Sequence, residues 1–94
     1  MTKLTRIVWT RNALADLEQV RAYLLENADP DTMRLEAARI WTATQRLTRF
    51  PASGRPGRIP ETRELVVAPY ILPYRIKDNV VEILDVFHSA QKRG

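Results

Sequence analysis

Residues 70–88 read YILPYRIKDNVVEILDVFH, and this stretch decides the fold. Two runs rich in β-branched and aromatic residues flank Asp78-Asn79, and both turn residues tolerate the positive φ that a two-residue hairpin turn requires. We therefore predict an antiparallel hairpin of strands 70–77 and 80–88. The turn sets the register, which pairs Lys77 with Val80, Arg75 with Glu82, Tyr74 with Ile83, Leu72 with Asp85, Ile71 with Val86 and Tyr70 with Phe87.

This register gives the predicted hairpin two different faces, because side chains alternate along a strand. We expect one face to lie under helices, and it carries Tyr70, Leu72, Tyr74, Ile76, Val81, Ile83 and Phe87. The opposite face carries Ile71, Pro73, Arg75, Glu82, Leu84, Val86 and His88. This second face is partly apolar, and an apolar open face on a small domain indicates a partner.

The segments before the hairpin predict one more strand and a basic loop. Residues 62–67 (TRELVV) have the composition of a strand. The segment from Pro51 to Pro60 contains SGRPGR at 53–58, and its glycines, prolines and arginines indicate a basic loop.

Two helices are predicted upstream of that loop, after a strand at 5–10. Thr10 or Asn12 caps the first helix, which ends near Asn27 and buries Ala13, Leu17, Val20 and Leu24. Asp29-Pro30 starts the second helix, which Pro51 ends. Its buried stripe is Met33, Ala37, Ile40, Thr44 and Leu47, with Trp41 beside it. We expect a single domain over residues 1–94, an α+β fold of order β-α-α-β-β-β, with an antiparallel sheet packed on one face by a helical hairpin.

Composition limits the possible function classes. The chain has 94 residues, no cysteine and one histidine, which excludes a disulfide framework and argues against a metal site; we expect no cofactor. No signal peptide and no apolar run of membrane-spanning length is present in the sequence, so we expect a cytoplasmic protein without membrane contact. The net charge of +4 favours anionic partners such as nucleic acid, an enzyme that handles nucleic acid, or an acidic protein segment.

The ordered series of local patterns resembles the toxins of the RelE/ParE superfamily over nearly the whole chain. The patterns are IVWT at 7–10, Ala13, Asp16-Leu17, FP at 50–51, GRPGR at 54–58, TRELVV at 62–67, PYILPYRI at 69–76 and VEILDVFH at 81–88. The resemblance implies the toxin of a type II toxin–antitoxin system, in a hetero-oligomer with a ParD-like antitoxin. The antitoxin carries the DNA-binding region, so the toxin would meet DNA only indirectly.

Two activities occur within that superfamily, and the sequence favours one of them. RelE-type toxins cleave mRNA in the ribosome and have an arginine just after the aromatic residue of the middle strand, where this chain has Ile71 after Tyr70. No tyrosine follows Tyr74, and few residues follow His88. We therefore expect a ParE-type toxin that inhibits DNA gyrase by binding, with no catalytic residue. The alternatives are a ribosome-dependent mRNA endonuclease that uses Arg75, His88 and the C-terminal basic residues, and a protein that serves only as a co-repressor with its antitoxin.

Two sets of site residues follow from this interpretation. The residues expected to face the target are Arg55, Arg58, Arg63, Arg75, His88, Lys92 and Arg93. Those expected to contact the antitoxin are Leu14, Leu24, Leu25, Trp41, Ile71 and Leu84. Structural roles stay open for several of them: Arg75 can form a cross-strand ion pair with Glu82, His88 can fix the end of a strand, and each arginine can belong to an ordinary solvated surface.

Overall fold

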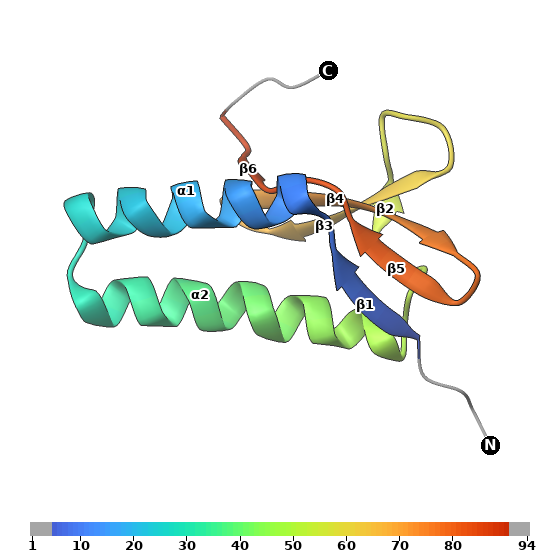
Figure 1. Cartoon of the computed structure of the whole chain (residues 1–94), viewed down its shortest axis with the longest axis horizontal. Coiled ribbons are helices and arrows are strands. Elements are labelled where there is room, and N and C mark those ends of the chain that lie inside the picture. Colours follow the sequence, from blue (N-terminus) through green and yellow to red (C-terminus); the bar gives the residue numbers. More distant parts are fainter. Residues whose placement is uncertain (1–4, 91–94) are drawn as a thin grey trace.

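A computed structural model describes residues 5–90 and confirms the expected order of the main elements (Figure 1). The two helices lie side by side as a hairpin, and a twisted sheet packs against them at one end. The elements are β1 (Arg6–Trp9), α1 (Arg11–Asn27), α2 (Pro30–Gln45), the short 3₁₀ helix η1 (Arg46–Thr48), β2 (Arg55–Pro56), β3 (Thr62–Val67), β4 (Tyr70–Lys77), β5 (Val80–Ile83) and β6 (Phe87–His88).

Both helices begin at a capping side chain, as the sequence predicts. The hydroxyl of Thr10 accepts a hydrogen bond from the backbone N–H of Ala13 at 3.2 Å, and Asp29 accepts one from Thr32 at 2.7 Å. Each cap satisfies a backbone donor that has no partner within its helix. The second helix ends at Gln45, earlier than Pro51, because its last turn tightens into η1.

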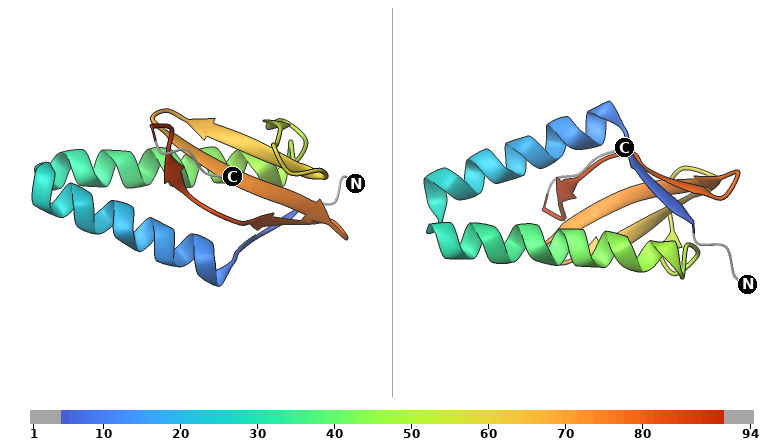
Figure 2. Two further views of the ribbon diagram at one scale, coloured as in Figure 1. Left: turned by 90° about the horizontal axis from the view of Figure 1, so that it is seen from above. Right: turned by 60° about the horizontal axis from the view of Figure 1, so that its bottom comes forward.

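The strands form a single sheet of order β1-β5-β4-β3-β2, with β6 paired to β4 beyond the end of β5. All pairings are antiparallel except one: β1 joins the edge of β5 in the parallel direction, so the sheet is mixed. Figure 2 shows how the chain leaves this edge through β1, runs along both helices and returns through the loop to the opposite edge.

The predicted hairpin register holds near the turn and is wrong at the far end. Asp78 and Asn79 have positive φ, and the pairs from Lys77–Val80 to Tyr74–Ile83 are confirmed. Further along, Tyr70 pairs with His88 and Ile71 with Phe87, so one extra residue has entered the second strand. The three predicted pairs Tyr70–Phe87, Ile71–Val86 and Leu72–Asp85 are therefore not formed.

The cause is a bulge that α1 stabilises. The backbone N–H of Val86 donates to the Asp16 carboxylate of α1 at 3.3 Å and to its neighbour Asp85 at 2.8 Å, instead of to a strand. Past the bulge every side chain changes face. Val86 joins the core under the helices, Phe87 turns to the open face, and His88 comes to the helix side, all opposite to the prediction.

The core lies where the helix hairpin covers the sheet. Its least exposed members are Ala13 from α1, Leu47 from η1, and Leu72, Tyr74, Val81 and Ile83 from the hairpin. Ile76, which was expected in this core, is 41% exposed near the hairpin turn. No helix within residues 5–90 is long and apolar enough to cross a membrane.

Candidate functional site

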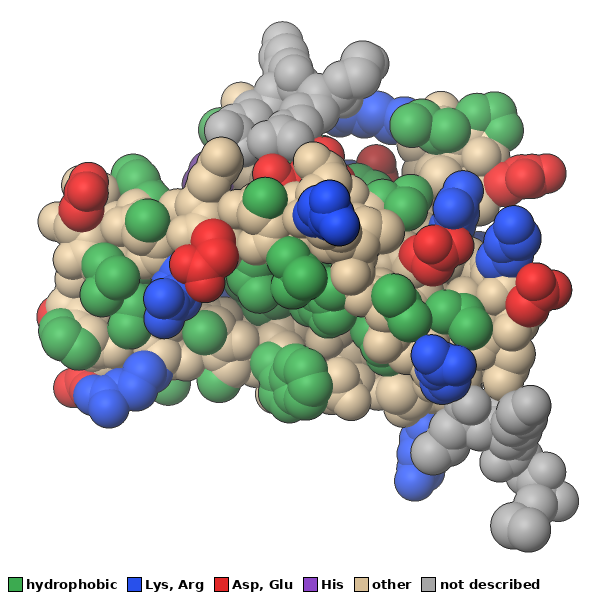
Figure 3. Space-filling view, viewed as in Figure 1, with side chains coloured by type: hydrophobic (Ala, Val, Ile, Leu, Met, Phe, Trp, Pro, Cys, Tyr) green, Lys and Arg blue, Asp and Glu red, His purple; other side chains and the backbone are tan. Residues whose placement is uncertain are grey.

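An apolar groove runs between α1 and α2 and opens on the face shown in Figure 3, where hydrophobic side chains gather between the helices. It encloses about 110 Å³. Its lining comes from three elements: Trp9 of β1, Leu17, Val20, Arg21 and Leu24 of α1, and Met33, Ala37, Ile40 and Trp41 of α2.

Part of the groove lies where the helices extend past the sheet, and another part is lined by Trp9 of β1. The connected ends of the helices project past the strands (Figure 1), so the apolar stripes of these last turns have no strand beneath them. Trp41 is 59% exposed, and Ala37, expected in a buried stripe, is exposed as well. A contiguous apolar surface of this kind on a small domain marks an interaction site.

The electrostatics of the groove are simple. Among the described residues, Arg21 is the only charged one that lines the groove, and its guanidinium lies 3.4 Å from Glu18 in an exposed pair. Exposed pairs of this kind contribute little and exchange readily. Arg21 is therefore available to an acidic group on a partner, while the remainder of the groove offers apolar contact.

The residues expected to contact an antitoxin lie on two surfaces, the helix pair and the open sheet face. Leu24 and Trp41 line the groove, and Leu14 and Leu25 are exposed on α1, at 50% and 56%. By contrast, Ile71 is 7% exposed and pairs with Phe87 across the open sheet face, so it is unavailable as an exposed anchor. Leu84 is half-buried on that same face, in a depression it shares with Pro73 and Phe87.

Sequence reasoning missed several groove residues. Met33 and Ala37 were assigned to the buried stripe of the second helix, and Trp9 was expected either to pack in the core or to contact the antitoxin. Helical spacing identifies an apolar stripe but does not say whether the chain itself or a partner covers it. The groove could have been predicted from the apolar residues near the ends of both helices, which are more numerous than a short sheet can cover.

The arginines expected to face a target are mostly held by neighbouring groups. Arg55 lies 2.9 Å from the buried carboxylate of Glu64, and Arg75 lies 2.9 Å from Glu82. The hydrogen bond and charge of Glu82 raise the pKa of Arg75 above its usual value. The predicted hairpin register placed Arg75 opposite Glu82, and the ion pair expected between these two residues is present. Both pairs lie on the open sheet face and are locally neutral.

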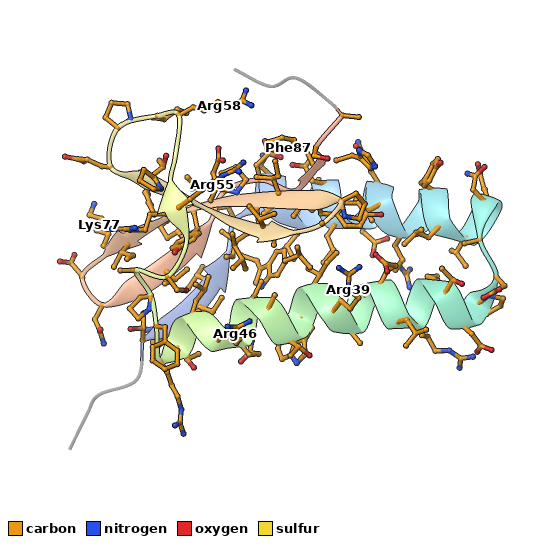
Figure 4. All side chains as sticks on the ribbon, turned by 180° about the vertical axis from the view of Figure 1, so that it is seen from behind. Arg39, Arg46, Arg55, Arg58, Lys77 and Phe87 are labelled. Atoms are coloured by element: carbon orange, nitrogen blue, oxygen red, sulfur yellow. The ribbon has the colours of Figure 1, made fainter. Side chains whose placement is uncertain are left out.

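The other predicted target residues do not share one surface. Arg58 lines the depression on the open sheet face, and Figure 4 shows it with Arg55 on the loop side of the molecule. Arg63 points the other way and donates to the carbonyl of Gly54 at 2.9 Å. His88 lies on the helix side, where its Nδ1 accepts from the backbone N–H of Ala90. Lys92 and Arg93 lie outside the described residues.

Chemistry on RNA requires a base, a cation and an acid around one phosphate. Within residues 5–90, Arg75 and His88 lie on opposite faces of the sheet, and the position after Tyr70 holds the buried, apolar Ile71. No three potential metal ligands gather in the same part of the chain. Within the described residues, Arg75 and His88 therefore do not converge on one site.

The model of one protein family, described as the ParE toxin of the type II toxin–antitoxin system parDE, matches residues 7–93 of this chain. The chain belongs to the ParE toxin family. It is thus the toxin component of a type II toxin–antitoxin system, within the RelE/ParE superfamily that the sequence patterns predicted.

Relatives of this ParE-family chain support the same conclusion. Y4kP of Sinorhizobium fredii, a protein named as a toxin, is 54% identical over 93% of this chain and 91% of its own length. Toxin RelE2 of Caulobacter vibrioides is 33% identical over 94% of this chain and 99% of its own.

Solved structures confirm the fold. A chain of the chromosomal ParDE system of P. aeruginosa superposes with a TM-score of 0.81 at 24% identity, over 93% of this chain and 98% of that one. A chain of the RelBE2 toxin–antitoxin complex of Mycobacterium tuberculosis gives 0.64 at 29% identity, over 90% of this chain and 98% of that one.

Proposed function

We propose that this ParE-family toxin arrests growth by binding DNA gyrase, without chemistry of its own, and that a ParD-like antitoxin neutralises it by occupying the groove between α1 and α2. The observation that carries the antitoxin proposal is the apolar groove itself, with Trp41 standing 59% exposed at its wall. A large aromatic side chain in such a position is the residue type that most often dominates a protein interface.

The groove suits one kind of partner segment. Its lining is apolar between two helices, which is the arrangement that receives the apolar face of an amphipathic helix. Arg21 at the rim favours a partner helix that carries an acidic residue beside its apolar stripe. The solved RelBE2 complex, which is similar to this chain at 29% identity, is a toxin–antitoxin complex, and this supports an antitoxin as the partner.

The choice of gyrase rests on family membership and on the arrangement of the basic groups. Arg55 and Arg75 are already paired with carboxylates, and His88 is on the other side of the sheet from Arg75. A ribonuclease of the RelE type would need such groups to converge on the reacting phosphate. A protein that acts by contact does not need this convergence.

Two purified-protein assays separate gyrase inhibition from mRNA cleavage. We expect the full chain to inhibit supercoiling of relaxed plasmid by gyrase, and to leave mRNA intact on translating ribosomes. The complex with antitoxin is the control, since it should inhibit nothing. Cleavage of ribosome-bound mRNA with normal supercoiling would replace the gyrase proposal with the endonuclease alternative. Normal growth of a host that accumulates the soluble chain alone would instead favour a co-repressor role.

A pair of variants tests the groove. Trp41→Ala should weaken antitoxin binding by about 30-fold or more, the effect of removing an interface hot spot of roughly 2 kcal/mol. The matched control is Leu35→Ala, because Leu35 is also exposed on α2, at 65%, but lies outside the groove. Equal antitoxin affinity for the two variants, measured by calorimetry on folded proteins, would remove the groove as the docking site.

A further inference from the structure

A second pocket lies on the other side of α1, between that helix and the end of the sheet. Its volume is about 360 Å³, within the range of roughly 300–1,000 Å³ typical of ligand pockets. Val20 lines both this pocket and the groove, so α1 forms the wall between them. The lining residues are Asp16, Gln19, Val20 and Tyr23 from α1, Tyr70 from β4, His88 from β6, and Ala90.

Three of the lining residues are aromatic, and two of them stand at right angles. The rings of Tyr70 and His88 have centroids 6.0 Å apart and an interplanar angle of 83°. Tyr23 adds a third ring that is 62% exposed on α1. Burial, followed by the nearby Glu36 and Tyr23, raises the pKa of Tyr70, while the charge of Arg39 acts in the opposite direction and is outweighed. The faces of the two tyrosine rings are electron-rich, and such faces attract a cation.

A carboxylate completes the pocket. Asp16 is 7% exposed and, within residues 5–90, is the one acidic residue that lines the pocket; no lysine or arginine from that part of the chain lines it. The interactions of this carboxylate include hydrogen bonds that its Oδ2 accepts from the backbone N–H of Val86 at 3.3 Å and from the side chain of Asn12 at 3.4 Å. A negative charge shielded from water interacts more strongly with a cation than an exposed one does.

We propose that this pocket binds the guanidinium or ammonium group of a basic side chain on a partner polypeptide. Asp16 pairs with the charge, and Tyr23, Tyr70 and His88 surround it. The pocket is separate from the groove, so this site extends the proposed antitoxin binding and does not depend on gyrase as the target. The cation comes from the antitoxin or from the target protein, and the two sources are distinguishable by experiment.

The test uses a neutral analogue as its control. Nα-acetyl-arginine amide titrated into the isotope-labelled full chain should shift the NMR signals of Gln19, Tyr23, Tyr70 and His88 in a saturable manner. Nα-acetyl-citrulline amide has nearly the same shape without the charge, and it should leave these signals in place. Equal shifts by both analogues, or shifts spread over the surface outside the pocket, would overturn the proposal.

Two substitutions assign the binding to named groups. Asp16→Asn keeps an oxygen for the Val86 N–H but removes the charge, and should weaken arginine-analogue binding by at least about tenfold. Tyr23→Ala changes an exposed side chain, so it should fold normally and weaken binding by about two- to fivefold. Leu35→Ala is the control outside the pocket. If Asp16→Asn fails to fold, an unchanged affinity in folded Tyr23→Ala still refutes the aromatic wall.

Titration of the arginine analogue into the toxin–antitoxin complex shows which partner supplies the cation. If the antitoxin supplies it, the arginine analogue binds the free toxin but not the toxin–antitoxin complex; if the target supplies it, the analogue binds both. Either result supports the pocket. Trp41→Ala keeps the two proposals apart, since it should lose antitoxin affinity while binding the arginine analogue normally. Loss of analogue binding in that variant would show that the pocket is not an independent site.

Discussion

Replacement of Tyr74 by phenylalanine removes one oxygen atom from the centre of the molecule and leaves two backbone groups without a partner. The Tyr74 hydroxyl donates to the carbonyl of Pro51 at 2.7 Å and accepts from the N–H of Gly54 at 2.9 Å. Both bonds fasten the basic loop after η1 to the sheet. A buried backbone group left unpaired costs about 1–3 kcal/mol. Gly54 is buried and Pro51 is half-buried, so we expect Tyr74→Phe to lose about 2–4 kcal/mol of unfolding free energy.

Urea unfolding followed by circular dichroism measures this loss. The midpoint should fall with an unchanged slope, because the surface exposed on unfolding is nearly the same. Amide hydrogen exchange at Gly54 should accelerate more than exchange in α1, since the loop loses its tether. Tyr23→Phe is the control, as Tyr23 is 62% exposed and should change the free energy by less than about 0.5 kcal/mol. A Tyr74→Phe protein as stable as this control would show that the two bonds do not hold the loop.

Three further predictions concern the same structural elements. Burial raises the pKa of Tyr74 and of Tyr70, so these phenols lose their protons at a lower pH in the unfolded chain than in the folded protein. The free energy of unfolding should therefore fall as pH rises above about 10. Urea midpoints measured from pH 9 to 11 should fall less steeply in Tyr74→Phe than in the unchanged protein. A Cβ at Gly54 would lie 2.6 Å from the Tyr74 hydroxyl oxygen, so Gly54→Ala should lose about 1–3 kcal/mol in thermal unfolding. The hydrogen bond from the Thr32 backbone lowers the pKa of Asp29. The Asp29 carboxylate therefore stabilises the folded protein above pH 3.8, and this contribution is lost as pH falls below that value. In Asp29→Ala the free energy of unfolding, measured in urea, should depend less steeply on pH in this range.

Local signals were enough to predict the helices and the turn of the hairpin. Thr10 and Asp29-Pro30 cap the helices through bonds to residues three positions away, and the Asp78-Asn79 turn has the positive φ that its residue types favour. Each of these features depends on neighbours in the chain. The sequence therefore contains all the information needed to place them.

The far end of the hairpin depends on a contact that no local pattern reveals. The bulge forms because Asp16, seventy positions earlier in the chain, accepts the N–H of Val86. Without that bond, continuing the alternation past Ile83 is the simpler expectation, and it places Phe87 and His88 on the wrong faces. The bulge, held by this long-range contact together with the bond from Val86 to its neighbour Asp85, places His88 in the pocket beside α1 and not on the open face with Arg75.

The candidate site was predicted in part, for a related reason. Leu24 and Trp41 were expected to contact an antitoxin and do line the groove, whereas Ile71 was expected to be exposed and is covered. Strand alternation places Ile71 on the open face correctly. It does not show that Phe87, moved by the bulge, covers it there.

The groove also has a thermodynamic consequence for the toxin without its partner. A domain of this size is stable by only about 5–15 kcal/mol, and the apolar turns that project past the sheet contribute less to that total than they would if covered. A partner present at 100 times its dissociation constant adds about 2.7 kcal/mol, which is a large fraction of the whole. Replacing Trp41 with a charged residue would remove exposed apolar surface and should not lower the stability of the free protein. The same change should weaken the antitoxin binding that we propose for the groove. We therefore attribute the exposed tryptophan at this position to the proposed antitoxin binding rather than to the stability of the isolated fold.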